Sequence, residues 1–341
     1  MGEHSKTTRR SFLKHTMIGM GAAAWTPAML QAMAQSAGSQ QGLPRRPMGR
    51  SGEQISILAI GGAHVARAGG TEEETISIIR EGIDEGINFL DNAWEYHGGY
   101  AEEVMGRALR DGYRDRVVLM TKHHGRDRAT AMQHLEDSLR RLRTDVIDVW
   151  QFHEVIRESD VRRIFSEGAI EAALEAKQQG KVRFIGFTGH RDPAFFRMML
   201  EQDVEWDTVQ MPMNPLDPHH ASFEKEILPI LLERGIAPLA MKTAAGGGAM
   251  RAGLEPTECL RYVWTLPVST AISGISSRSD LRQNVAAARA FQPMTEHDIT
   301  ALLARTREAG TGGEYETYKT TQRWDGPIGR QQQERGGVRD R

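Results

Sequence analysis

Four polar residues in the first half of the chain are of the types needed to interconvert a carbonyl and an alcohol: Asp91, Tyr96, Lys122 and His153. Reduction of a carbonyl needs a proton donor for its oxygen, and a phenol with an ordinary pKa of about 10 needs help in that task. A lysine ammonium stabilises the phenolate, and an aspartate keeps that lysine charged and positioned. A histidine can donate a hydrogen bond to the carbonyl oxygen and orient it. The set therefore predicts a hydride-transfer site in which Tyr96 is the general acid.

Each of these residues also has a plain structural explanation when it is taken alone. Asp91 could cap a turn, and Tyr96 could be a half-buried aromatic in a loop. Lys122 could be a solvated strand end, and His153 a hydrogen-bonded core histidine. Only the combination, placed at the ends of successive strands, favours chemistry.

The elements that must position these residues follow a regular pattern. From about residue 55, short apolar runs alternate with segments of helical period, each cycle taking about 30 residues, which is typical of parallel strands joined by helices. The predicted strands are residues 55–60, 88–90, 117–121, 146–152, 182–187, 208–211, 236–241 and 270–272. No Gly-x-Gly-x-x-Gly turn follows the first strand, so an open doubly wound sheet is disfavoured. We predict an α/β fold, a single-domain (β/α)8 TIM barrel over residues 43–310.

In such a barrel, active groups lie at the carboxyl ends of the strands and in the loops that follow. Asp91 comes directly after the second predicted strand, and Tyr96 lies in the loop behind it. Lys122 and His153 come directly after the third and fourth predicted strands. The barrel is therefore expected to bring the four side chains together at one end.

The two ends of the chain carry their own signals. Residues 1–34 place Arg9-Arg10 before a short apolar stretch and small residues, which predicts a cleavable twin-arginine signal peptide. The chain is then expected to be exported, to the periplasm or beyond, with the twin-arginine translocase as a transient partner. The apolar stretch is too short for a stable membrane anchor. The tail, residues 311–341, holds Tyr315, Tyr318 and Trp324 and is expected to pack on the barrel.

Charge and cysteine content narrow the function classes. The formal net charge of −2 becomes −5 when the predicted leader, with its net charge of +3, is removed. Such a chain is not expected to bind nucleic acid. One cysteine, Cys259, excludes an internal disulfide and fits folding in the cytoplasm before export. No feature of the sequence indicates an oligomeric state.

The segments around the four polar residues resemble the aldo-keto reductase superfamily. Residues 89–99, Phe-Leu-Asp-Asn-Ala-Trp-Glu-Tyr-His-Gly-Gly, are similar to its Asp-x-Ala-x-x-Tyr-Gly motif, and residues 118–122 and 145–153 are similar to its lysine and histidine strands. The resemblance extends from residue 43 to about residue 290. It implies that Tyr96 is the acid in reduction and the base in oxidation. It also implies that Lys122 and Asp91 tune Tyr96, and that His153 orients the carbonyl.

The resemblance also implies a nicotinamide cofactor, with NADPH favoured over NADH, and no metal. Gln210 matches the glutamine that holds the carboxamide, and Thr188 keeps the hydroxyl of the usual Ser-Asn pair but is followed by glycine. Met241 stands where many relatives stack an aromatic ring, and Lys242 could reach the pyrophosphate. His190 is a candidate substitute for the missing amide.

At the adenosine end, the segment 274–284 is similar to the family's Gly-x-Ser-x-x-x-x-Leu-x-x-Asn pattern. Gly274 and Asp280 stand where some relatives have two basic residues that bind the 2′-phosphate. The implied adenine contacts are Gln283 and Asn284, and phosphate recognition is expected from Ser276, Ser277 and Arg278 or Arg282.

Substrate recognition leaves several possibilities open. Trp94 is the candidate wall of the substrate pocket, and the polar His64, Arg67 and Glu154 permit a hydroxylated, sugar-like substrate. Two further function classes compete with a carbonyl reductase: a cofactor-binding sensor or subunit with little turnover, and a metal-dependent sugar isomerase. A reductase variant that retains NADP and recycles it internally on a sugar is a fourth hypothesis. The isomerase would use the pairs His123-His124 and His219-His220, but adjacent histidines project differently and no matching carboxylate set accompanies them.

Overall fold

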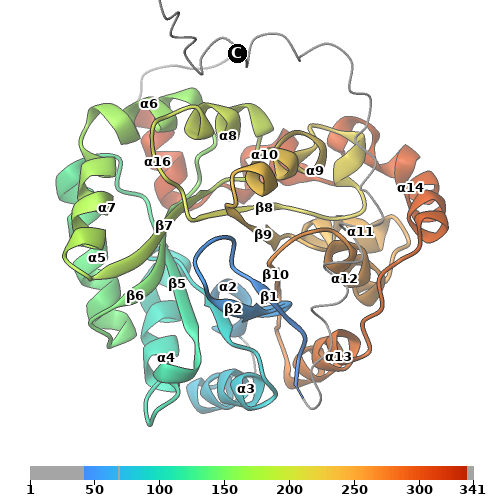
Figure 1. Ribbon diagram of the computed structural model, residues 1–341, viewed down its shortest axis with the longest axis horizontal. Helices are drawn as coiled ribbons and strands as arrows, with labels where there is room; N and C mark the ends of the chain where they lie inside the picture. The colour runs from blue at the N-terminus through green and yellow to red at the C-terminus, as the bar shows by residue number, and fades with distance from the viewer. Residues whose placement is uncertain (1–41, 68–69, 336–341) are drawn as a thin grey trace, which may run out of the picture.

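The computed structural model describes residues 42–67 and 70–335, so the predicted signal peptide lies outside the described residues. The barrel strands are β3 (Leu58–Gly61), β4 (Phe89–Asp91), β5 (Val118–His123), β6 (Ile147–Phe152), β7 (Val182–Thr188), β8 (Thr208–Pro212), β9 (Ala237–Met241) and β10 (Thr270–Ser273). They pair in parallel, each with its neighbours in sequence, and β10 closes on β3 (Figure 1). The predicted single-domain (β/α)8 TIM barrel is confirmed.

The first predicted strand, residues 55–60, is in fact divided between two elements. Its beginning belongs to β2 (Gln54–Ser56), which pairs antiparallel with β1 (Arg45–Pro47), and its end belongs to β3. The chain turns at Ile57, whose N–H donates to Pro44 O at 2.9 Å. A continuous apolar run cannot reveal such a break, because both halves are buried.

Helices surround the barrel (Figure 1). The longer ones are α3 (Glu72–Asp84), α4 (Tyr100–Ala108), α5 (Arg128–Leu142), α6 (Glu158–Ser166), α7 (Ala169–Gln178), α8 (Pro193–Leu200), α12 (Pro256–Thr265), α13 (Arg278–Arg289), α14 (Glu296–Gly310) and α16 (Pro327–Arg335). The shorter ones are α2 (Gly62–Val65), α9 (Phe223–Glu226), α10 (Leu228–Glu233), α11 (Gly248–Arg251) and α15 (Thr317–Thr320). Side-chain caps such as Thr71, Asp127 and Thr295 begin several of them by accepting a hydrogen bond from the first turn.

Two apolar clusters hold the fold together. A small one fills the barrel interior and includes Phe89, Val118 and Leu239, together with Met48 and Ile55 from the β1–β2 hairpin. Phe89 and Val118 begin their strands, so the hairpin closes the amino-terminal end of the barrel. The larger cluster lies between the strands and the helices. With one end closed, the site predicted at the carboxyl ends of the strands occupies the other.

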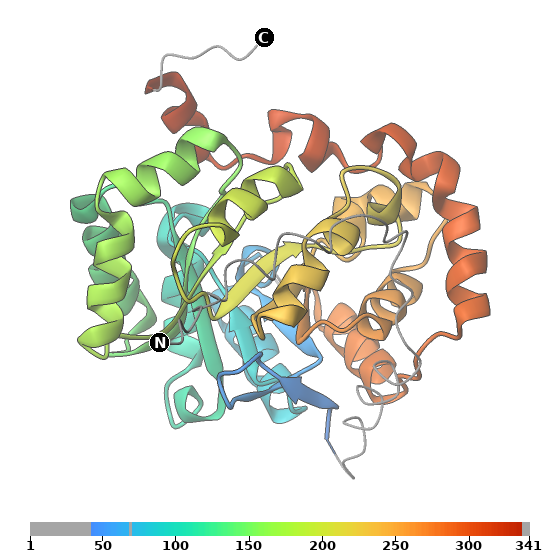
Figure 2. The same cartoon turned by 45° about the horizontal axis from the view of Figure 1, so that its top comes forward.

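The segment after α14 runs along the upper edge of the view in Figure 2. Tyr318 is completely buried, and its hydroxyl accepts a hydrogen bond from Asn214 Nδ2 at 2.8 Å. Lys319, also buried, donates to the carboxylate of Asp217 at 2.7 Å. These contacts attach the segment to the loop after β8. Within the described ranges, none of the helices has the length and apolar character needed to cross a bilayer.

Candidate active site

The carboxyl ends of the barrel strands surround a cavity of about 750 Å³. The predicted site residues that line it are Asp91, Tyr96, His153, Thr188, Met241, Lys242, Gln283 and Asn284, and the polar His64, Arg67 and Glu154 line it too. Lys122 and Gln210 do not line the cavity but contact Asp91 from inside the barrel. Strands β4, β5 and β6 pair side by side, which explains why their ends gather residues distant in sequence.

Lys122 is the centre of the polar cluster at the barrel mouth. Its side chain is 1% exposed, and its ammonium donates to the carboxylate of Asp91 and, at 2.6 Å, to Asn92 O. It also donates to the hydroxyl of Tyr96 at 3.3 Å. Burial lowers the pKa of Lys122, and the Asp91 carboxylate opposes that shift. The structure thus brings the aspartate, lysine and tyrosine into one hydrogen-bonded chain.

His153 meets Tyr96 edge to face, with ring centroids 5.6 Å apart and an angle of 78° between the planes. Its backbone N–H donates to His123 O at 2.8 Å, which continues the β5–β6 ladder by one residue. Burial, reinforced by nearby cationic groups, lowers the pKa of His153 well below its ordinary value. The imidazole is therefore neutral at neutral pH and holds one N–H that can donate.

The electrostatics of Tyr96 differ from the sequence-based expectation. Burial raises the pKa of the Tyr96 hydroxyl well above 10, and the carboxylates of Asp91, Glu95 and Glu154 raise it further. These effects outweigh the attraction of the phenolate to Lys122. The phenol is therefore held protonated across the neutral range, the state that donates a proton.

The nicotinamide end of the predicted cofactor site has two buried polar atoms that are available to bind a ligand. Gln210 Nε2 donates to Asp91 at 3.2 Å, whereas Gln210 Oε1 and Thr188 Oγ1 are buried with no hydrogen-bond partner in the described part of the chain. Met241 is half-buried in the cavity wall. Lys242 faces the rings of Tyr318 and Trp324, at 5.5 and 5.2 Å from their centroids, and burial lowers its pKa to about 8. These residues fit an uncharged amide better than a free ion.

The adenosine end departs from the expected phosphate contacts. Gln283 and Asn284 line the cavity, but Ser276, Ser277 and Arg278 do not. Ser277 caps α13, and the backbone N–H of Ser276 donates to the Asp280 carboxylate at 2.9 Å. Arg278 pairs with Glu81 and donates to Ser77 on α3, and Arg282 pairs with the same glutamate. Both arginines therefore pair with Glu81 on α3 and do not line the cavity.

The expectation that Trp94 forms a wall of the substrate pocket is not met, because its side chain packs against α5. The indole stacks on His134 with centroids 3.7 Å apart and donates to the carboxylate of Asp137 at 3.3 Å. Arg141 lies over its ring. An aromatic side chain in this loop can face either the cavity or the surrounding helices. The position of α5, which supplies the partners of Trp94, determines which side it faces.

Three further residues near the catalytic cluster had no place in the predicted hydride-transfer site: Glu95, which lines the cavity, and His124 and Asp325, which do not. Of these, the sequence drew attention only to His124, as one of two adjacent histidines. Glu95 precedes Tyr96, and His124 follows Lys122 by two positions, so strand alternation could have placed it on the same side as the lysine. Asp325 comes from the C-terminal segment, where it binds His190 and Arg191 at 3.3 and 2.8 Å. No local signal connects positions so far apart in sequence.

Glu154→Gln is expected to flatten the pH dependence of the free energy of unfolding between about pH 4.5 and 7. Burial raises the pKa of Glu154 from 4.5 to about 7, so the folded chain keeps a proton that the unfolded chain has released. The stability that this proton provides is complete below pH 4.5 and is lost as the pH rises to about 7, a change on the order of 3 kcal/mol. Urea unfolding at a series of pH values measures it. The exposed Glu136→Gln should keep the wild-type slope, and parallel curves for Glu154→Gln and wild type would contradict the assignment.

Comparison with known proteins adds independent evidence. The Aldo/keto reductase family model matches residues 57–258. The chain is 28% identical over 313 residues to an uncharacterized oxidoreductase of Bacillus subtilis, covering 77% of this chain and 97% of that protein. It is 29% identical over 223 residues to the 6-dehydroglucose reductase of Novosphingobium aromaticivorans, covering 59% of this chain and 69% of that protein.

A solved aldo/keto reductase from Klebsiella pneumoniae, in complex with NADP and acetate, superposes with a TM-score of 0.64. It is 22% identical, and the match covers 79% of this chain and 96% of that one, which shows a shared fold. The family match spans more than half of the chain and includes Asp91, Tyr96, Lys122 and His153. The chain therefore belongs to the aldo/keto reductase family and is an oxidoreductase.

Proposed function

We propose that the protein interconverts an aldehyde or ketone and its alcohol with a nicotinamide cofactor, and that Tyr96 is the general acid in the direction of reduction. The observation that carries this proposal is Tyr96, which lines the cavity and whose hydroxyl lies 3.3 Å from the Lys122 ammonium. A carbonyl oxygen beside that hydroxyl would receive the proton, and the resulting phenolate would lie beside a paired cation. His153 would orient the same oxygen from the other side with its N–H.

The reduced nicotinamide supplies the hydride when it is bound. On the side of the protein, Gln210 Oε1 and Thr188 Oγ1 are the buried atoms available to hold the carboxamide, and Met241 offers an apolar, polarizable surface for the ring. The raised pKa of Tyr96 keeps the proton on the phenol until a carbonyl oxygen arrives. A protonated phenol is the form that reduction requires, whereas oxidation requires the phenolate.

NADPH is our proposed cofactor in preference to NADH. The solved relative with bound NADP supports it, while the adenosine end has Asp280 in the cavity wall and Arg278 paired with Glu81. If the 2′-phosphate is accommodated, Arg278 or Arg282 must exchange Glu81 for the phosphate. Measuring the dissociation constants of NADPH and NADH side by side tests the preference directly.

The proposed substrate is hydroxylated and sugar-like. The cavity wall contains the polar side chains of His64, Arg67 and Glu154, which can hydrogen-bond hydroxyl groups. The name of the Novosphingobium relative, 6-dehydroglucose reductase, points to the same chemical class. A small aliphatic carbonyl would leave these groups without partners.

A fluorescence titration with NADPH, followed by a turnover screen of aldehydes, ketones and oxidised sugars, tests the proposed function. We expect saturable binding and oxidation of NADPH that depends on the carbonyl. Binding with no turnover on any carbonyl would favour the sensor hypothesis. No binding of either nucleotide would favour the isomerase hypothesis and overturn the proposal.

We also propose that the chain is exported by the twin-arginine route with its cofactor already bound. Free NADPH is scarce outside the cytoplasm, so an exported enzyme that released it would stall, whereas one that retains it could recycle it by oxidising and reducing a sugar in turn. The C-terminal segment supports retention because Trp324, Gly326 and Pro327 line the cavity and Arg191 holds Asp325 between them. Residues 1–34, the predicted twin-arginine signal, would direct the chain to an export route used by proteins that fold before transport.

Protein purified from the periplasm is expected to release about one nicotinamide nucleotide per chain when it is denatured. The nucleotide is identified by mass spectrometry of the supernatant, and an unrelated periplasmic protein purified in parallel gives the background. A supernatant without nucleotide would contradict retention and leave an enzyme that exchanges its cofactor.

A further inference from the structure

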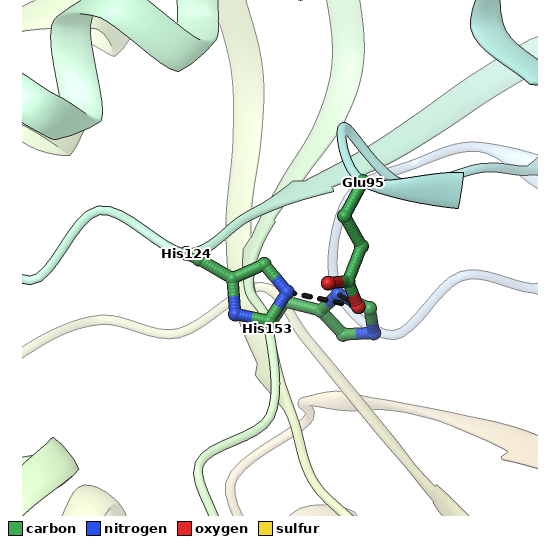
Figure 3. Close-up of side chains that lie close together, drawn as sticks. All are labelled: Glu95, His124 and His153. Carbon is green, nitrogen blue, oxygen red and sulfur yellow. Dashed lines mark ion pairs between the residues drawn. The ribbon is translucent and has the colours of Figure 1, made fainter. Parts of the chain in front are cut away.

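Three side chains from three consecutive barrel loops converge beside the catalytic cluster: Glu95, His124 and His153 (Figure 3). Glu95 Oε1 lies 3.0 Å from His124 Nε2 and 3.6 Å from His153 Nδ1. The centroids of the two imidazole rings lie 4.7 Å apart, and the ring planes are tilted by 49°. One ligand atom from each of the three residues thus lies within 4.8 Å of the other two.

The cluster is nearly closed to solvent but open to the cavity. The three side chains are 8%, 0% and 9% exposed, and Glu95 and His153 belong to the cavity wall. In the described part of the chain, Glu95 Oε2 and His153 Nδ1 have no hydrogen-bond partner. A buried carboxylate oxygen and a buried ring nitrogen without partners are costly unless something else binds them.

We propose that Glu95, His124 and His153 bind a divalent transition-metal ion of the Zn²⁺ class, with a fourth coordination position open to the cavity. Two histidines and one glutamate are ligands that Zn²⁺ takes, and three protein ligands with one open position are typical of zinc sites that bind small molecules. Tetrahedral bonds of about 2.1 Å need ligand atoms about 3.4 Å apart, close to the 3.0 and 3.6 Å that separate Glu95 from the two histidines.

The charges around the cluster are compatible with a cation. A second carboxylate, Glu154, is 5% exposed and has a buried Oε2 without a hydrogen-bond partner in the described residues. Two cationic side chains near His153 are already paired with carboxylates, because Lys122 pairs with Asp91 and Arg126 pairs with Asp160 at 3.2 Å. The carboxyl groups of Glu95 and Glu154 therefore remain available to interact with an added cation.

The adjacent residues His123 and His124 contact different partners. His123 turns toward Trp150 and stacks on it with centroids 3.9 Å apart, whereas His124 turns toward His153. The partners of His124 come from the loops after β4 and β6, not from the neighbouring residue. The side-by-side pairing of β4, β5 and β6 places the three ligands together.

Binding of the ion has a consequence for turnover that rests on the proposed function. A metal ion on Nδ1 of His153 fixes the imidazole that is proposed to orient the carbonyl, so Zn²⁺ is expected to change the rate of reduction. Ion binding itself is measured without substrate, which keeps a failure of this inference distinguishable from a failure of the proposed reaction.

The test uses the intact protein, stripped of metal with a chelator, and two probes: Zn²⁺ by calorimetry and Co²⁺ by visible absorption. We expect one Zn²⁺ per chain, and a Co²⁺ spectrum of the intensity typical of tetrahedral coordination that Zn²⁺ abolishes. Glu95→Gln and His124→Gln should each weaken binding by at least about 100-fold, because loss of outer-sphere partners alone costs about 10- to 100-fold.

His97→Asn is the matched control, because it removes a histidine of the same cavity that lies outside the cluster. Its φ of 53° is one that asparagine accepts, and we expect unchanged Zn²⁺ affinity. Circular dichroism checks that each variant is folded. Wild-type protein that gives no tetrahedral Co²⁺ spectrum would overturn the proposal, as would Zn²⁺ binding that survives in folded Glu95→Gln and His124→Gln.

Discussion

Tyr96→Phe is expected to slow carbonyl reduction by about 10²- to 10⁴-fold, the usual contribution of a positioned general acid. The substitution removes the hydroxyl that lies 3.3 Å from Lys122 Nζ and leaves the ring against His153. The affinity for NADPH should stay within about twofold, because the atoms proposed to hold the carboxamide belong to Gln210 and Thr188. Steady-state rates and a fluorescence titration measure the two effects separately.

The matched control is Tyr113→Phe. The Tyr113 hydroxyl bonds the carboxylate of Asp84 at 3.0 Å at an exposed site, so its loss should leave both the rate and the affinity unchanged. An unaffected rate in Tyr96→Phe would remove this residue from the mechanism. Loss of NADPH binding together with activity would show that the hydroxyl supports the site rather than the proton transfer.

Lys122→Met is expected to lower the free energy of unfolding by about 3–5 kcal/mol and to abolish measurable turnover. The lysine and its partner Asp91 are 1% and 6% exposed, and removing the cation leaves a buried carboxylate without its charge partner. Two neighbouring groups lose their donor as well, the carbonyl of Asn92 and the hydroxyl of Tyr96. Urea unfolding followed by tryptophan fluorescence measures the stability.

Two further variants identify the cause of that loss. Lys181→Met removes an exposed lysine that pairs with Glu136 at 2.6 Å, and should cost no more than about 1 kcal/mol. The double variant Asp91→Asn, Lys122→Met contains neither buried charge and should recover part of the lost stability without recovering activity. A single Lys122→Met variant as stable as wild type would contradict the buried pair as we describe it.

The barrel and the arrangement of the tetrad could be predicted because their signals are local and repeated. Each strand is a short apolar run, and Asp91, Lys122 and His153 each follow such a run directly. Once consecutive strands pair in parallel, their carboxyl ends lie side by side, which brings these positions together. The error at residues 55–60 has the opposite origin, since a hairpin and a barrel strand that are both buried look like one run.

The predictions that the structure does not support depend on tertiary packing, that is, on which neighbouring elements a side chain contacts. Arg278 was expected at a phosphate, but Glu81 on α3 binds it across a helix interface that no spacing rule describes. Trp94 turns to His134 for the same kind of reason. The pKa of Tyr96 was expected to fall beside a lysine, but burial and three carboxylates raise it. Burial is a property of the packed structure and cannot be read from the residue types alone.

Transfer of deuterium from the cofactor is the most direct test of the central claim. The protein is incubated with NADPH deuterated at both C4 positions and with an aldehyde found in the turnover screen, and the alcohol is analysed by mass spectrometry and NMR. We predict one deuterium, bonded to the carbinol carbon, and no such product from Tyr96→Phe on the same timescale. An alcohol formed without deuterium on that carbon would contradict hydride transfer at this site.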